Sequence, residues 1–127
     1  MRDRPDAADL LAIAREVLRG KLIGHVPQAL RFDALMIANA MANAERETAA
    51  GEAPLEAERE RLARHYGEPL GTEPLAEALL RLNRRLAAEI RAGRLDGDRE
   101  IERHLLATAL DAVRESNPKY LASRGIE

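Results

Sequence analysis

The feature that most constrains the fold of this chain is a charge-free stretch in its first half. No Asp, Glu, Lys or Arg occurs between Asp33 and Glu45, although 33 % of the residues in the 127-residue sequence are charged. The stretch is too short to span a bilayer, which takes about 20 apolar residues. A helix that is apolar nearly all round is normally buried in protein. The stretch therefore predicts the middle of a buried central helix.

Composition indicates the same class of structure for the rest of the chain. The strong helix formers Ala, Leu, Arg and Glu dominate, whereas the aromatic residues, which favour strands, make up only 2 %. A chain of 127 residues has the commonest size of a single domain. We therefore predict an all-α fold with one helical domain over residues 1–127. It is expected to be a compact bundle of four to five helices, mostly antiparallel, with a central helix at about residues 27–50.

Local signals set the ends of the other predicted helices. The first helix opens at Asp6, with acids in its first turn. The third helix, from about Glu52 to Gly67, carries a thin apolar stripe and is expected on the outside of the bundle. Thr72 is expected to cap the fourth helix, and Asp98 is expected to cap the fifth.

Two asparagines interrupt the apolar character of the central helix. Asn39 and Asn43 lie on a different side from the apolar seam of that helix. Asn is a poor residue for a helix interior, and a buried amide without a partner costs about 1–3 kcal/mol. The predicted partners are Arg46 on the same helix and Asn83 on the apolar face of the fourth helix.

This polar group has two interpretations. In the first it is structural, because a buried polar pair fixes which helices meet or sets the register of a homodimer. In the second, Asn39, Asn43, Arg46 and Asn83 form the binding site of a small-ligand-binding protein or a weak enzyme. We favour the structural interpretation, and both interpretations require Asn39 and Asn43 to be buried.

The residue types that carry catalysis or bind metals form no recognisable motif. The three histidines, His25, His65 and His104, fall in different elements, and none follows a Glu by three positions as in helical-bundle metal sites. Glu100 and His104 are expected to form an ordinary exposed i,i+4 pair. The chain has no cysteine, no glycine-rich phosphate loop and no Gly-x-Ser-x-Gly elbow. We therefore expect no catalytic residue, no metal site and no cofactor.

A stripe of arginines on the fourth helix is the main cationic surface in the sequence. Its members are Arg81, Arg84, Arg85 and Arg91. Such a stripe could hold phosphate or an acidic partner. The net charge of −2 and the scarcity of aromatic side chains argue against nucleic acid as that partner. We expect a solvated face that is balanced by Glu56, Glu58 and Glu60 of the third helix.

The sequence favours a cytoplasmic location. The first residues are charged and are not followed by the apolar run of a signal peptide. No apolar stretch has the length of a membrane span, so no membrane partner is expected.

Three short segments of the sequence are similar to segments of a known protein family. They begin at Arg2, Arg31 and Asn117 and read Arg-Asp-Arg-Pro-Asp-Ala-Ala-Asp-Leu-Leu, Arg-Phe-Asp-Ala-Leu-Met-Ile-Ala-Asn-Ala and Asn-Pro-Lys-Tyr. They resemble a small bacterial family of uncharacterised all-α proteins, a domain of unknown function, along most of the chain. These motifs have no assigned chemistry, so the resemblance implies no site residue. It does imply that the gene lies beside genes for aminoglycoside/choline-kinase-like phosphotransferases and acyl-CoA dehydrogenases, and hence an accessory role near acyl-CoA metabolism. Because the central helix has more apolar surface than a single seam needs, we expect a non-enzymatic protein that binds such an enzyme and can itself form a homodimer.

Overall fold

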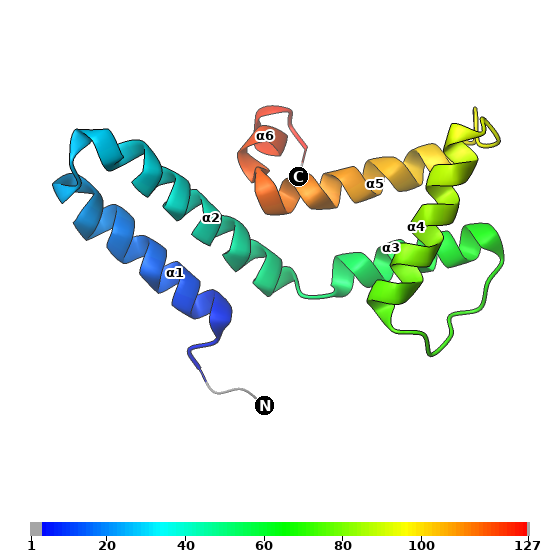
Figure 1. Cartoon of the computed structure of the whole chain (residues 1–127), viewed down its shortest axis with the longest axis horizontal. Helices are drawn as coiled ribbons and strands as arrows, with labels where there is room; N and C mark the ends of the chain where they lie inside the picture. The colour runs from blue at the N-terminus through cyan, green and yellow to red at the C-terminus, as the bar shows by residue number, and fades with distance from the viewer. Residues whose placement is uncertain (1–3, 127) are drawn as a thin grey trace. The chain divides into compact units, whose positions relative to one another are not determined.

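The computed structural model describes residues 4–126, which contain six α-helices and no strand (Figure 1). The helices are α1 (Ala7–Val17), α2 (Arg31–Ala50), α3 (Ala53–Tyr66), α4 (Leu75–Arg91), α5 (Arg99–Ser116) and α6 (Pro118–Ser123). Helices in contact pack antiparallel, so the all-α prediction is confirmed. Within this described range no helix combines the length and apolarity needed to cross a membrane.

The chain divides into two compact units, Met1–Gly51 and Glu52–Glu127. Each unit has its own helix contacts, with α1 against α2 in the first and α3 against α4 and α5 in the second. We therefore describe each unit by itself, and a single domain over residues 1–127 stays a prediction.

The first unit is a hairpin in which α1 and α2 run side by side (Figure 1). Asp6 caps α1, since its carboxylate accepts a hydrogen bond from the backbone of Asp9 and the Asp9 carboxylate accepts one from the backbone of Asp6. A π-helical turn and two 3-10 turns connect α1 to α2. An ion pair of 2.8 Å between Arg15 and Glu45 joins the two helices.

The central helix is far less buried than predicted. It begins at Arg31, after a 3-10 turn, rather than near Pro27. Ala34 and Ala38 are the only buried side chains in the described part of the hairpin, whereas Phe32 is 70 % exposed. The other exposed large apolar residues of the hairpin are Leu10, Ile13, Val17, Leu22, Leu30, Leu35, Met36 and Ile37. The prediction of burial all round is wrong because, within the hairpin, α1 covers only the alanine side of α2.

The second unit is built around α3. Leu62 of α3 is fully buried and packs with Leu82 and Leu86 of α4 and with Ile101 of α5. The prediction that this helix lies on the outside is therefore wrong. A thin stripe is sufficient here because its apolar residues lie where two other helices meet α3.

Of the two N-cap residues that the sequence predicts for the second unit, the structure confirms one and contradicts the other. Asp98 caps α5 as predicted, with its carboxylate accepting hydrogen bonds from the backbone of Glu100, at 3.0 Å, and of the next residue. Thr72 does not cap α4, which begins at Leu75 directly after a proline and has no side-chain cap.

Candidate functional site

Helices α3 and α5 line a cavity of about 520 Å³ in the second unit. Its polar lining consists of three arginines, two histidines and one glutamate: Arg61, Arg64, His65, Glu100, Arg103 and His104. On each helix these residues follow one another at i, i+3 and i+4, which places them on one face. The apolar part of the lining consists of Leu62 and Ile101, which belong to the core, and of the partly buried Ala107.

His104 lies at the centre of the polar contacts in this cavity. Its side chain is 5 % exposed, and Nδ1 accepts a hydrogen bond of 3.2 Å from Nε of Arg61. Because Nδ1 is an acceptor, the neutral ring carries its proton on Nε2. Burial, and then the positive charge of Arg61, lowers the pKa of His104. The ring is thus held neutral, with an N–H donor at Nε2.

The cavity carries more positive charge than negative. Arg61, Arg64 and Arg103 have no carboxylate within ion-pair distance in the described part of the chain. Glu100 is the single acid in the lining, and its side chain is 61 % exposed. Since the guanidinium groups stay charged at all physiological pH values, the site can attract an anion.

The residues present suit an anion better than a metal ion. No group of three or more His, Cys, Asp or Glu side chains that could hold a metal occurs within residues 4–126. Guanidinium groups are donors only and cannot coordinate a cation. The arrangement can therefore form charge-assisted hydrogen bonds to oxyanions.

The sequence-based view of the histidines requires a correction. His65 and His104 come from different helices but line the same cavity. The predicted exposed pair of Glu100 with His104 is wrong, because His104 is buried against Arg61, while Oε1 of Glu100 lies 3.8 Å from Nδ1 of His65. Spacing within α5 places Glu100 near His104, but it cannot show that α3 supplies competing partners for both.

The predicted asparagine site is not buried. Asn39 and Asn43 are both exposed, so the burial that either interpretation required is wrong. Asn43 Oδ1 accepts a hydrogen bond from the guanidinium of Arg46, one helical turn away. The physical reason for the exposure is that α1 packs against the alanine side of α2 and leaves the asparagine side open within the hairpin.

Asn83 belongs to the second unit. Its amide is partly buried and donates a hydrogen bond of 2.7 Å to Oε1 of Glu58 on α3. The structure thus places Asn39, Asn43 and Arg46 in one unit and Asn83 in the other. That these four residues bind a ligand stays a prediction.

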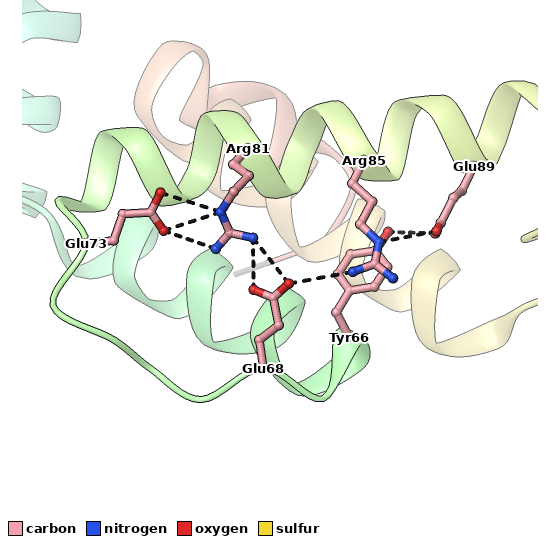
Figure 2. A network of polar contacts seen from close by, with 6 residues as sticks. All are labelled: Tyr66, Glu68, Glu73, Arg81, Arg85 and Glu89. Carbon is pink, nitrogen blue, oxygen red and sulfur yellow. Dashed lines mark hydrogen bonds and ion pairs between the residues drawn. The ribbon is translucent and has the colours of Figure 1, made fainter.

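Two of the four arginines in the α4 stripe, Arg81 and Arg85, pair with other carboxylates than those predicted. Arg81 forms ion pairs with Glu68 at 2.9 Å and with Glu73 at 3.0 Å, both in the segment between α3 and α4 (Figure 2). Arg85 lies 3.3 Å from Glu89 and 3.6 Å from Glu68. These contacts hold the segment between α3 and α4 against α4.

The glutamates of α3 have other partners than the arginines of α4. Glu56 forms an ion pair with Arg59 of its own helix, and Glu58 accepts the hydrogen bond from Asn83. No ion pair of Glu60 with the stripe occurs in the described residues. The prediction that Glu56, Glu58 and Glu60 balance the charge of the α4 arginines is therefore wrong, because these glutamates do not pair with those arginines in the part of the chain that the structure describes.

Tyr66 connects the same network to the core of the second unit. Its hydroxyl donates a hydrogen bond of 2.9 Å to Glu89, and the guanidinium of Arg85 lies 3.9 Å from the ring centre (Figure 2). Burial, followed by the hydrogen bond to Glu89, raises the pKa of Tyr66 to about 12. Because Arg81 and Arg85 already pair with carboxylates, we interpret this network as structural.

Sequence reasoning missed the cavity between α3 and α5. A signal was present, because Arg61, Arg64 and His65 show the same i, i+3, i+4 spacing as a second group that begins at Glu100. What the sequence lacked was any sign that these two faces lie opposite each other.

Comparison with known proteins places the chain in a family. No curated protein and no solved structure matches it significantly. Two of the three segments that carry the resemblance, those at Arg31 and Asn117, lie inside the region 24–120 that matches a family model. The segment at Arg2 lies before this region. Residues 24–120 match the family described as a domain of unknown function (DUF6285), and the chain belongs to this family.

Proposed function

We propose that this DUF6285 protein is a non-enzymatic, cytoplasmic accessory protein that acts through protein–protein contact, with the α1–α2 hairpin as its contact surface. The observation that carries the proposal is the exposure of nine large apolar side chains on a hairpin that buries only Ala34 and Ala38. Together these side chains offer an apolar area on the order of the 800 Å² that one partner of a standard interface buries. Exposed apolar area of this amount is more than a monomeric protein usually shows, and it indicates contact with another protein.

A second copy of this chain is the occupant that the hairpin fits. Two helices alone cannot enclose a core, and domains of about 60 residues or fewer are marginally stable by themselves. Two hairpins related by a two-fold axis would complete a four-helix bundle, a common architecture for such helices. Residues 1–51 contain seven basic and seven acidic residues, so two identical hairpins do not repel each other through net charge. We therefore propose a homodimer.

The partner of the dimer is proposed from the family resemblance. It would be a phosphotransferase-like or acyl-CoA dehydrogenase-like enzyme. Titration of the purified protein into each enzyme class from the same genome, followed by isothermal calorimetry, tests this step. Saturable binding to one class supports the accessory role, and no heat of binding with either class rejects it.

The dimer is tested by the molar mass in solution. Light scattering during gel filtration should give twice the chain mass of 14.0 kDa. Ile37→Glu places a charge among the exposed apolar residues and should shift the protein towards the monomer, because burying an unpaired charge is unfavourable. Ala50→Glu adds the same charge at the exposed last residue of the same helix, more than three turns from Ile37, and should leave the dimer intact.

A monomeric wild-type protein at micromolar concentration would contradict the homodimer. So would equal loss of the dimer in Ile37→Glu and in Ala50→Glu, since the effect would then not depend on the apolar surface.

Small-ligand binding is the second candidate function. The observation that favours it is the cavity between α3 and α5, with its three arginines that lack carboxylate partners. Binding at Asn39, Asn43, Arg46 and Asn83 is a separate prediction and no part of this candidate, because none of these residues lines the cavity. The candidate is tested by isothermal calorimetry of the protein with phenyl phosphate, and the absence of a heat of binding rejects it.

A further inference from the structure

We infer that the cavity between α3 and α5 binds the phosphate group of a small phosphorylated molecule, with Arg61, Arg64 and Arg103 as its ligands. The inference is independent of the proposed dimer, because every residue that lines this cavity belongs to the second unit. It rests on the position of Arg61, the local excess of positive charge and the apolar part of the lining.

Arg61 is held in place before any ligand arrives. Its Nε donates to Nδ1 of His104, and one terminal nitrogen donates to Oγ1 of Thr108, both at 3.2 Å. A guanidinium has five N–H groups, and no bond from the other terminal nitrogen of Arg61 occurs in the described structure. These remaining N–H groups are available to an oxyanion. A side chain that is already ordered loses less conformational entropy on binding.

The cavity has the charge that a dianion requires. Arg64 and Arg103 are exposed and flank Arg61 in the lining, while Glu100 is the only acid among the lining residues. The overall charge of the chain is −2, so this positive excess is local. Arginine is the residue best suited to phosphate because its planar fork donates two parallel hydrogen bonds.

The size and apolar lining of the cavity indicate a small organic phosphate. A volume of about 520 Å³ lies within the range of small-molecule sites. Ala107, which is only partly buried, offers an apolar contact to the part of the ligand that carries the phosphate, whereas Leu62 and Ile101 are almost wholly buried. The neutral ring of His104 adds an uncharged N–H donor. Inorganic phosphate shares the charged contacts but gains nothing from the apolar ones, so we expect it to bind more weakly than a phosphate monoester.

Titration with phenyl phosphate and with inorganic phosphate tests the site. The full-length protein should bind both by isothermal calorimetry, and phenyl phosphate should bind more tightly. Equal or tighter binding of inorganic phosphate would still support the phosphate site and would identify the free ion as its occupant. The imidazole NMR signals of His65 and His104, which line the cavity, should shift on titration, and sodium chloride at the same ionic strength should not reproduce the shift.

Variants separate this site from a general attraction between opposite charges. The double variant Arg64→Gln/Arg103→Gln changes two exposed side chains and should raise the dissociation constant of phenyl phosphate by about tenfold or more. Arg84→Gln removes the same charge from an exposed arginine of α4 outside the cavity and should leave the constant unchanged.

Three results would overturn the inference. The first is the absence of histidine shifts with both phosphates, and the second is an equal shift with chloride. Both can be read on the wild-type protein alone. The third is a double variant that is folded by circular dichroism and binds phenyl phosphate as tightly as the wild type.

Discussion

Arg61 and Arg81 are the same residue type in two different electrostatic situations. Arg81 lies between Glu68 and Glu73, so its charge is compensated by two carboxylates. Arg61 is oriented by His104 and Thr108, which are both uncharged partners when the histidine is neutral. Both side chains are therefore ordered, but only Arg61 keeps a charge that a ligand can neutralise.

The buried ring of His104 makes the stability of the protein depend on pH. Burial and the charge of Arg61 lower the pKa of His104 from its ordinary value of 6.5. Below about pH 6.5 the unfolded chain binds a proton that the folded protein still refuses, so the free energy of unfolding falls as the pH drops through the folded pKa. This contribution to stability is fully present above 6.5. His104→Asn keeps an oxygen acceptor for Arg61 but does not titrate, so we expect it to lose this part of the pH dependence.

Urea unfolding at about pH 7.5 and about pH 5 measures the effect. His25→Asn removes an exposed histidine of the first unit and serves as the control, which should retain the His104 contribution. If His104→Asn and the wild type lose the same free energy of unfolding between the two pH values, the prediction is wrong.

Among the elements, α4 shows when a sequence pattern is sufficient to predict burial. Its residues Leu79, Leu82 and Leu86 repeat at helical spacing and are all buried. The pattern on α2 is longer and more apolar, yet Phe32 is exposed. The difference is the number of neighbours, since a helix can bury only the faces that other helices cover.

The N-cap of α5 should be a measurable source of stability. The carboxylate of Asp98 accepts hydrogen bonds from the backbone of Glu100 and Ile101 at 3.0 and 3.2 Å. Asp98→Ala should lower the free energy of unfolding by about 1 kcal/mol, because these N–H groups lose their partner. Chemical denaturation is the measurement. Asp96→Ala, the same change two residues earlier at an exposed position, should have a smaller effect.

An effect of Asp96→Ala as large as that of Asp98→Ala would show that the change in charge near the helix, and not the cap, controls the stability.

At the scale of the whole molecule, the two units differ in how much core they contain. Residues Glu52–Glu127 enclose a cluster of Leu62, Leu82, Leu86 and Ile101 from three helices. Residues Met1–Gly51 bury two alanines in the part that the structure describes. Burial of apolar side chains therefore stabilises the second unit by itself more than it stabilises the first.

This difference predicts how the two units behave as separate fragments. A fragment of residues 52–127 should be helical by circular dichroism and should unfold in a cooperative thermal transition. A fragment of residues 1–51 should be poorly helical at low micromolar concentration, because short helices without a core are marginal. Its helicity should rise with concentration if identical hairpins associate.

The two fragments control for each other, since both are measured in the same buffer over the same concentration range. Loss of the cooperative transition in fragment 52–127 would contradict the independence of its core. Concentration-independent helicity of fragment 1–51 would contradict association of the hairpin.

The sequence by itself determined the helices and several of their ends. Helix propensity and local hydrogen bonds act within a few residues, so the all-α class, the cap at Asp98 and the buried stripe of α4 could be predicted. The i, i+3, i+4 spacing of Arg61, Arg64 and His65 was also visible in the sequence, but the sequence did not show that these residues line a cavity.

Only the tertiary structure decided which faces the helices cover. It buried Leu62 on a helix with a thin apolar stripe and left Asn39 and Asn43 exposed on the helix that carries the long charge-free stretch. It also brought Arg61 of α3 to His104 of α5, residues that are far apart along the chain. Burial and site formation depend on contacts between elements that are distant in sequence, and the periodicity of one helix carries no information about which helix lies opposite it.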